Sequence, residues 1–277
     1  MAKKNKKLKH ISVKRKKTKK ATGQQEISVH QNAMQQALAF HRVGRLPEAE
    51  ALYRQILQTE PNHPEALHFL GLLAHQSGQS GIGVDLISRA VRVRPDYVQA
   101  HFNMGKVLFE QNKLDDAAGS FRRVLELRPD YAEAHNNLGI TLYDLGRLKE
   151  AVACYQRALN LKPDSVQVHF NLGITLQDLG RLEEAAACFR RVLTAKPDYA
   201  EAHYNLGVIL NEQGHLDEAA ACYRQALALK PDLAEALNNL GIILREQGRL
   251  EEAVACFRRA IVLKPDCLLY TSDAADE

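Results

Sequence analysis

Side chains with reactive or metal-binding groups recur along this chain at a constant interval of 34 residues. One set comprises the cysteines Cys154, Cys188, Cys222 and Cys256, and another comprises the histidines His101, His135, His169 and His203. If each interval forms one structural repeat, equivalent atoms lie about 10 Å apart. A disulfide needs Cα atoms within about 7 Å, and zinc ligands lie about 2.3 Å from one ion. We therefore expect packed thiols and half-buried neutral imidazoles, with no metal and no cofactor; pH-sensitive packing of the histidines is the alternative.

A third series consists of asparagines. Its members are Asn103, Asn137, Asn171, Asn205 and Asn239. Asparagine inside a helix is unfavourable by roughly half a kcal/mol relative to alanine, so its recurrence needs a reason. An amide offers a donor and an acceptor together and pairs with both polar groups of a peptide unit. Three residues of extended peptide, at about 3.3 Å each, span one repeat of about 10 Å. The series thus predicts a clamp on the main chain of a bound peptide. The alternative is that tandem duplication copied a structural asparagine passively.

The neighbours of these asparagines predict an amphipathic binding surface. Phe102, Phe170 and Tyr204 directly precede three of them, and the positions three residues after the asparagines carry Lys106, Ile140, Ile174, Val208 and Ile242. The chain contains no phosphate-binding glycine loop and no HExxH motif, and no serine or cysteine stands apart from the repeat pattern. The residues present therefore predict no catalytic site and no enzyme activity.

The elements that position these series follow the same interval. Glycines recur at 71, 105, 139, 173, 207 and 241, and prolines at 61, 95, 129, 163, 197, 231 and 265. Such periodicity is typical of repeat proteins, in which stacked units share one continuous core. We define seven units, at residues 30–63, 64–97, 98–131, 132–165, 166–199, 200–233 and 234–266.

Each unit predicts two antiparallel helices. In unit 132–165, Gly146 ends the first helix and Pro163 ends the second. Asp164 is expected to cap the next helix, with Gln167 three residues later. The same spacing recurs in Asp130 with Glu133, Asp198 with Glu201, and Asp232 with Glu235. Gly139 and Ala151 are expected where the two helices cross closely, because larger side chains would separate them.

The pattern resembles the tetratricopeptide repeat. It is carried in order by Leu138, Gly139, Tyr143, Ala151, Tyr155, Ala158 and Pro163. The resemblance covers roughly residues 30–266 and implies an all-α fold, a right-handed superhelix (α-solenoid) of about seven helix-turn-helix repeats whose first helices line a concave groove. Gly81 and Gly83 lie within a predicted second helix, which we expect to be the softest because each glycine costs about 1 kcal/mol relative to alanine.

The asparagine series is similar to the asparagine ladder in the superhelix of O-linked N-acetylglucosamine transferases. That resemblance implies peptide contacts by the five asparagines. Our first hypothesis is a protein-interaction scaffold that holds an extended peptide or a partner helix in the groove. The alternative is the N-terminal, substrate-recruiting region of a truncated bacterial glycosyltransferase of that type.

The two ends of the chain differ from the repeats. Residues 1–20 carry eleven Lys and Arg and no acid, so we expect 1–29 to be a disordered basic tail. Solvation, nucleic acid, anionic lipid or a nuclear-localisation-like role all remain open for it, and without interleaved aromatics it predicts no specific nucleic-acid binding. Residues 267–277 resemble a translated sequencing adapter, so we expect them to be an artefact.

The sequence gives weaker indications of the cellular location and of the oligomeric state. No apolar run has the length of a transmembrane segment, and unpaired cysteines suit a reducing compartment, so we expect a cytoplasmic protein. An uncapped last repeat would expose apolar surface, which predicts weak self-association.

Overall fold

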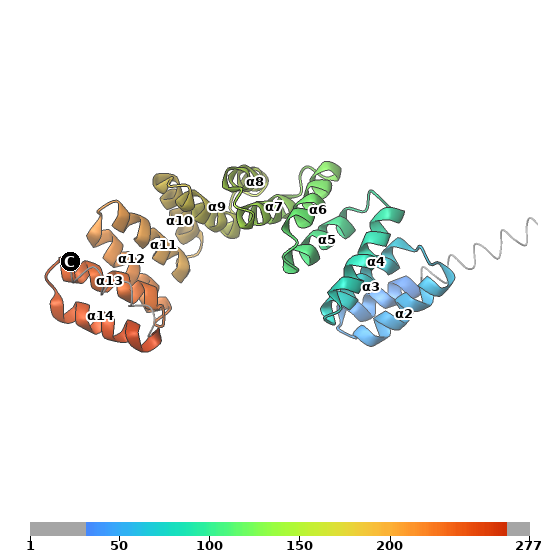
Figure 1. Cartoon of the computed structure of the whole chain (residues 1–277), viewed down its shortest axis with the longest axis horizontal. Helices are drawn as coiled ribbons and strands as arrows, with labels where there is room; N and C mark the ends of the chain where they lie inside the picture. Colours follow the sequence, from blue (N-terminus) through green and yellow to red (C-terminus); the bar gives the residue numbers. More distant parts are fainter. Residues whose placement is uncertain (1–31, 265–277) are drawn as a thin grey trace, which may run out of the picture. The chain divides into compact units, whose positions relative to one another are not determined.

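The computed structural model describes residues 32–264. The predicted tail at 1–29 and the predicted artefact at 267–277 lie outside them. All regular elements of the described part are α-helices, and Figure 1 shows them as successive hairpins. A helix over 32–42 comes first, and the others are α2 (Leu46–Thr59), α3 (Pro64–Gln76), α4 (Ser80–Val93), α5 (Val98–Glu110), α6 (Leu114–Leu127), α7 (Ala132–Asp144), α8 (Leu148–Leu161), α9 (Val166–Asp178), α10 (Leu182–Ala195), α11 (Ala200–Glu212), α12 (Leu216–Leu229), α13 (Ala234–Glu246) and α14 (Leu250–Leu263).

These helices confirm the predicted hairpins. From the second repeat on, the first helix of each hairpin (helix A) begins at the first residue of a predicted repeat. The second helix (helix B) ends shortly before the proline that recurs every 34 residues. The chain divides into two compact units, 1–128 and 129–277. Within each unit, consecutive helices pack together, and α3 contacts α5 just as α7 contacts α9 and α9 contacts α11. The A helices of successive repeats therefore lie beside one another within a unit.

Glycine at the end of helix A stops the helix, as predicted. Gly146 has a φ of 72°, in the left-handed region that a side chain disfavours, and Gly180, Gly214 and Gly248 repeat that conformation. Asn112 occupies the same place after α5 with a φ of 57°. Asparagine tolerates this region better than most residues, so the turn keeps its shape without glycine.

Glycine inside helix A permits a close contact with an aromatic ring of helix B. A Cβ on Gly139 would lie 2.6 Å from Cε1 of Tyr155, and on Gly105 it would lie 2.7 Å from Cε1 of Phe121. The predicted close crossing is therefore real, and the ring four residues after Ala151 is what fills it. In the α3–α4 hairpin, a Cβ on Gly83 would lie 2.7 Å from the carbonyl oxygen of Gly71. Gly83 thus has a packing role, whereas a Cβ on Gly81 would meet open space.

The predicted capping boxes are wrong. The N-cap residues of α7, α9, α11 and α13 are Tyr131, Ser165, Tyr199 and Leu233, and none makes a side-chain capping hydrogen bond. The reason is a shift of one residue, because each Pro-Asp pair forms a turn before the helix begins. Glu133 is consequently the second helical residue, and it pairs with Lys162 at the end of α8 instead of capping its own helix.

Within residues 32–264, no helix combines the length and the apolar character that crossing a membrane requires.

Candidate functional site

A hollow of about 200 Å³ opens between neighbouring A helices of the second unit. Its lining comes from α7, α8 and α9 and consists of Ile140, Tyr143, Asp144, Tyr155, Asn171, Ile174 and Thr175. One predicted asparagine, Asn171, therefore lies beside Ile140 and Ile174, two of the residues expected to flank the series. The hollow joins apolar walls to a carboxylate and an amide.

Two asparagines of the series already bind other side chains. Asn103 Nδ2 donates to His68 Nε2 at 2.9 Å, and its Oδ1 accepts from Gln99. Asn171 Nδ2 donates to Asn136 Oδ1 at 3.2 Å, and its Oδ1 accepts from Gln167. In both cases the acceptor belongs to the preceding repeat, 35 residues earlier. Each amide retains one N–H and one lone pair for a ligand.

The other three asparagines are less engaged. Asn239 Nδ2 donates to the Tyr223 hydroxyl over a long 3.4 Å. The side chains of Asn137 and Asn205 are half-buried in α7 and α11 and make no hydrogen bond within the described part of the chain. These two amides therefore keep their full capacity to pair with a peptide backbone.

The predicted aromatic residues pack partly inside their own hairpins. The Phe102 ring lies edge-on to Phe121, with centroids 5.8 Å apart, and the Phe170 ring lies edge-on to Phe189 at 5.7 Å. Phe170 also stacks on Tyr199 at 4.8 Å. The Tyr204 ring is tilted against the Tyr223 ring, with centroids 5.9 Å apart. All three predicted residues remain half-buried, so each presents only part of its ring to a ligand.

Sequence reasoning missed Tyr143 and Asp144 at this site. Asp144 is the last residue of α7 and makes no hydrogen bond or ion pair within residues 32–264, and burial raises the pKa of its carboxyl. Tyr143 donates from its hydroxyl to Asp178 at 2.6 Å, and this bond contributes most to raising the pKa of Tyr143 to about 12. A signal was present, because an acid ends every A helix from α5 onwards: Glu110, Asp144, Asp178, Glu212 and Glu246.

The first unit contains a buried histidine that the sequence analysis also missed. His68 is fully buried, and its Nδ1 lies 3.1 Å from the Tyr97 hydroxyl. Because the Asn103 amide donates to Nε2, the proton is on Nδ1, which donates to Tyr97. Burial, reinforced by the charge of Arg94, lowers the pKa of His68 to about 4. His68 is therefore neutral and structural.

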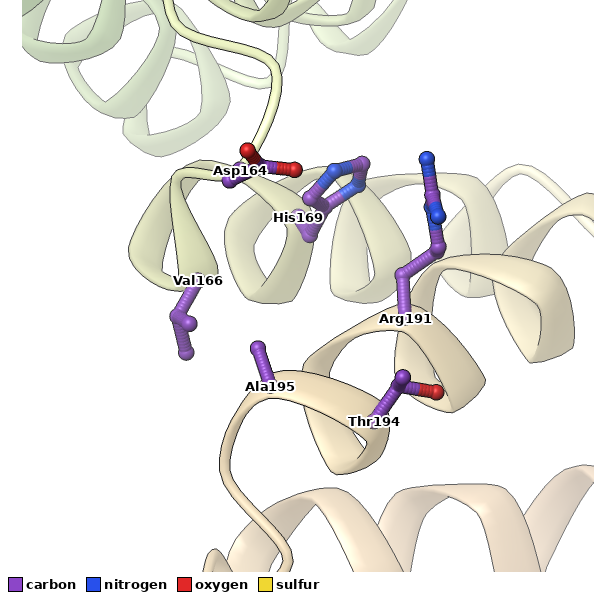
Figure 2. Close-up of a pocket in the computed structure, with 6 residues that line it drawn as sticks. All are labelled: Asp164, Val166, His169, Arg191, Thr194 and Ala195. Atoms are coloured by element: carbon purple, nitrogen blue, oxygen red, sulfur yellow. The ribbon is translucent and has the colours of Figure 1, made fainter.

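The histidine series is structural as predicted. His101, His135 and His169 each place Nε2 between 2.8 and 3.1 Å from the carbonyl oxygen of the proline six residues earlier. His203 does the same with Pro197 at 2.9 Å. Figure 2 shows His169 beside Asp164 in a small pocket of about 90 Å³, with Arg191 and Thr194 from helix B. This pocket lies where helix A begins against the end of helix B, and its histidine fastens the preceding turn.

The cysteine series also packs as predicted. All four cysteines are half-buried, and none of them forms a disulfide within the described residues. Burial raises the pKa of Cys188 to about 11 and also raises the pKa of Cys222 and Cys256. A raised pKa lowers the thiolate fraction and hence the reactivity of a cysteine at neutral pH. No group of three or more potential metal ligands occurs within residues 32–264.

A family model described as tetratricopeptide repeat matches the chain at residues 34–81, 77–124, 102–166, 170–232 and 212–266. A search of curated protein sequences gives no match.

Several solved structures share the fold. PilF of Pseudomonas aeruginosa superimposes with a TM-score of 0.65 at 20% identity, over 77% of this chain and 97% of its own. YrrB, described as a tetratricopeptide repeat protein with an unusual peptide-binding site, gives 0.59 at 23% identity over 68% and 97%. MamA of Desulfovibrio magneticus gives 0.58 at 19% identity over 61% and 96%. At these identities the likeness concerns the fold alone.

Proposed function

Because the chain belongs to the tetratricopeptide repeat family, we propose that it is a protein-interaction scaffold that binds an extended peptide along the A helices of its second unit. The observation that carries this proposal is the state of Asn137 and Asn205. Both are half-buried polar side chains in helices, in register with Asn171 in the hollow, and neither has a hydrogen-bond partner within the described residues. A peptide backbone supplies the donor and the acceptor that each amide lacks.

Two further features support a peptide as the ligand. Partly exposed rings at Phe170 and Tyr204 adjoin the asparagines and provide apolar contact for peptide side chains. The structural relative YrrB is described as having a peptide-binding site on the same type of repeat. Main-chain pairing reads sequence weakly, so this part of the surface accepts many sequences, and specificity comes from side-chain pockets.

The test uses three labelled twelve-residue peptides, (Lys-Thr-Ser)4, (Gln-Thr-Ser)4 and (Glu-Thr-Ser)4, and fluorescence anisotropy with the full chain. Twelve extended residues match the four A helices of the second unit, at about three residues per repeat. The double variant Asn137→Ala/Asn205→Ala should raise the Kd of every bound peptide at least tenfold, or about 1.4 kcal/mol. It should leave the melting temperature nearly unchanged, because neither amide holds another residue.

Asn160→Ala is the matched control, since Asn160 is an exposed asparagine on helix B of the same unit. It should leave all three affinities unchanged. N-methylation of the peptide backbone should weaken binding in the parent and have little further effect in the double variant. Equal binding by the double variant and the parent, or binding of none of the peptides, would contradict the proposal. The glycosyltransferase alternative stays a prediction, with no observation here that favours it.

A further inference from the structure

Acidic side chains in the second unit differ in whether a cation lies beside them. Near helix N-termini, Glu133 pairs with Lys162, Glu184 with Arg181 and Glu252 with Arg249. At the C-terminal ends of A helices, the acids Asp144, Asp178, Glu212 and Glu246 form no ion pair within the described residues. The acids that end the A helices therefore belong to the carboxylates of residues 32–264 without a cationic partner, as do the turn acids Asp130, Asp164, Asp198 and Asp232.

The helix dipole makes an acid at the C-terminal end of helix A unexpected. The C-terminal end of a helix carries a partial negative charge, so an acid there is unfavourable by about 0.3–1 kcal/mol, whereas an acid at the N-terminus is favourable. Helix A therefore ends repeatedly in the charge that its own dipole disfavours. Asp144 is exposed at the rim of the hollow, and desolvation by the neighbouring residues raises the pKa of its carboxyl. No residue within 32–264 forms an ion pair with Asp144, and a cationic ligand would supply the missing charge.

The hollow beside Asp144 has the chemistry of a lysine site. Its walls are the half-buried side chains of Ile140 and Ile174, which suit the aliphatic stem of lysine. Asp144 provides a carboxylate that no cation within residues 32–264 neutralises. Asn171 lines the same hollow and retains a lone pair for a further N–H donor.

We propose that the hollow lined by Ile140, Asp144, Asn171 and Ile174 binds a lysine side chain of the extended peptide, so that the partner is a basic segment. This inference rests on the proposed function and names the class of peptide. The ammonium group contacts Asp144, the stem lies between the two isoleucines, and the peptide backbone continues along the A helices. Asp178, Glu212 and Glu246, which follow Asp144 at intervals of 34 residues, favour further basic residues about three positions apart.

The same three peptides test this inference at an ionic strength of about 0.15 M, where distant charges are largely screened. The parent chain should bind (Lys-Thr-Ser)4 at least fivefold more tightly than (Gln-Thr-Ser)4, and (Glu-Thr-Ser)4 more weakly than either. Asp144→Asn should remove most of the preference for lysine and leave the affinity for the glutamine peptide unchanged. Asp144→Lys should bind the glutamate peptide better than the lysine peptide.

Asp198→Asn is the matched control, because it makes the same change in net charge at an exposed turn that does not line the hollow. It should leave the lysine preference intact. Equal losses in Asp144→Asn and Asp198→Asn would mean diffuse charge attraction and would overturn the inference. Equal parent affinities for the lysine and glutamine peptides, combined with weakening by Asn137→Ala/Asn205→Ala, would overturn the lysine site alone. Binding of no peptide would overturn both proposals.

Discussion

At the scale of single residues, two glycines of one hairpin have opposite surroundings. A Cβ at Gly105 in α5 would collide with the Phe121 ring, whereas a Cβ at Gly119 in α6 would meet nothing within 4 Å. Gly105→Ala should therefore lower the free energy of unfolding by about 1–3 kcal/mol through overpacking. Gly119→Ala should raise it by up to about 1 kcal/mol, because alanine favours the helix. Urea denaturation followed by circular dichroism measures both, and equal shifts in one direction would contradict the contact geometry.

His68 predicts a pH dependence of stability. Its pKa is about 4 in the folded protein and near 6.5 in an unfolded chain, so the unfolded state binds more protons between these values. The stability that neutral His68 contributes is complete above pH 6.5 and is lost as the pH falls toward 4. We expect a loss of about 2 kcal/mol between pH 7.5 and pH 5 from this group.

The control for this prediction comes from the array itself. Asn136 takes the place of His68 two repeats later and accepts the corresponding hydrogen bond from Asn171. The variant His68→Asn therefore keeps an acceptor for Asn103 but cannot titrate in this range. Urea midpoints across the pH series should fall less steeply for His68→Asn than for the parent. Parallel curves would show that His68 is not the group responsible.

The sequence predicted the type of each residue series better than its contacts. The histidines, cysteines and interior glycines lie where the period placed them, because each contacts groups that recur in every repeat, such as the proline carbonyl that each histidine bonds. The bonds of Asn103 and Asn171 depend instead on residues of the preceding repeat, His68 and Asn136. Those partners follow no family pattern, since Phe170 and Tyr204 occupy the same register elsewhere. Comparing the position of His68 and Asn136 between repeats would have indicated which asparagines have a partner in the preceding repeat.

At the scale of elements, helix boundaries were predictable and helix capping was not. Pro163 and Gly146 restrict the backbone directly, so the sequence locates the ends of α8 and α7. A capping box depends on a register of one residue, and the Pro-Asp turn moves the start of α9 past Asp164 to Val166. Spacing alone cannot separate a cap from a turn residue that precedes it.

Helix α14 should be the least protected helix of the second unit. Only Ala253 and Ala260 are buried in it, whereas α12, of the same length, buries Ala219, Ala220, Tyr223 and Ala226. Local opening is easiest where few side chains are buried. Hydrogen exchange measured by mass spectrometry should therefore be faster in peptides from α14 than in peptides from α12. Equal protection would indicate that another surface covers α14.

The exposed side chains of α14 also bear on assembly. Leu250 and Val262 are 60% and 83% exposed, and Val254 and Ile261 are close to half exposed. Such apolar surface is compatible with the predicted self-association, which stays a prediction.

At the scale of the whole molecule, the chain divides into two compact units, and the boundary in the sequence lies between Arg128 and Pro129. The uniform period predicts one continuous array and gives no sign of this division, because Pro129 lies at the same place in its repeat as every other proline of the series. The 34-residue period describes only the features that all repeats share, so it cannot locate a boundary between two of them. The candidate peptide site and the lysine hollow both belong to the second unit.

The ion pairs between helix A and helix B have a consequence for how such a gene can change. Glu133 with Lys162, Glu201 with Lys230, and Glu235 with Lys264 each join two positions of one 34-residue segment. Unequal recombination that deletes or copies a whole segment removes or adds both partners together. In these three repeats no charge is left without its partner, so the number of repeats can change without breaking the ion pairs of the hairpins that remain.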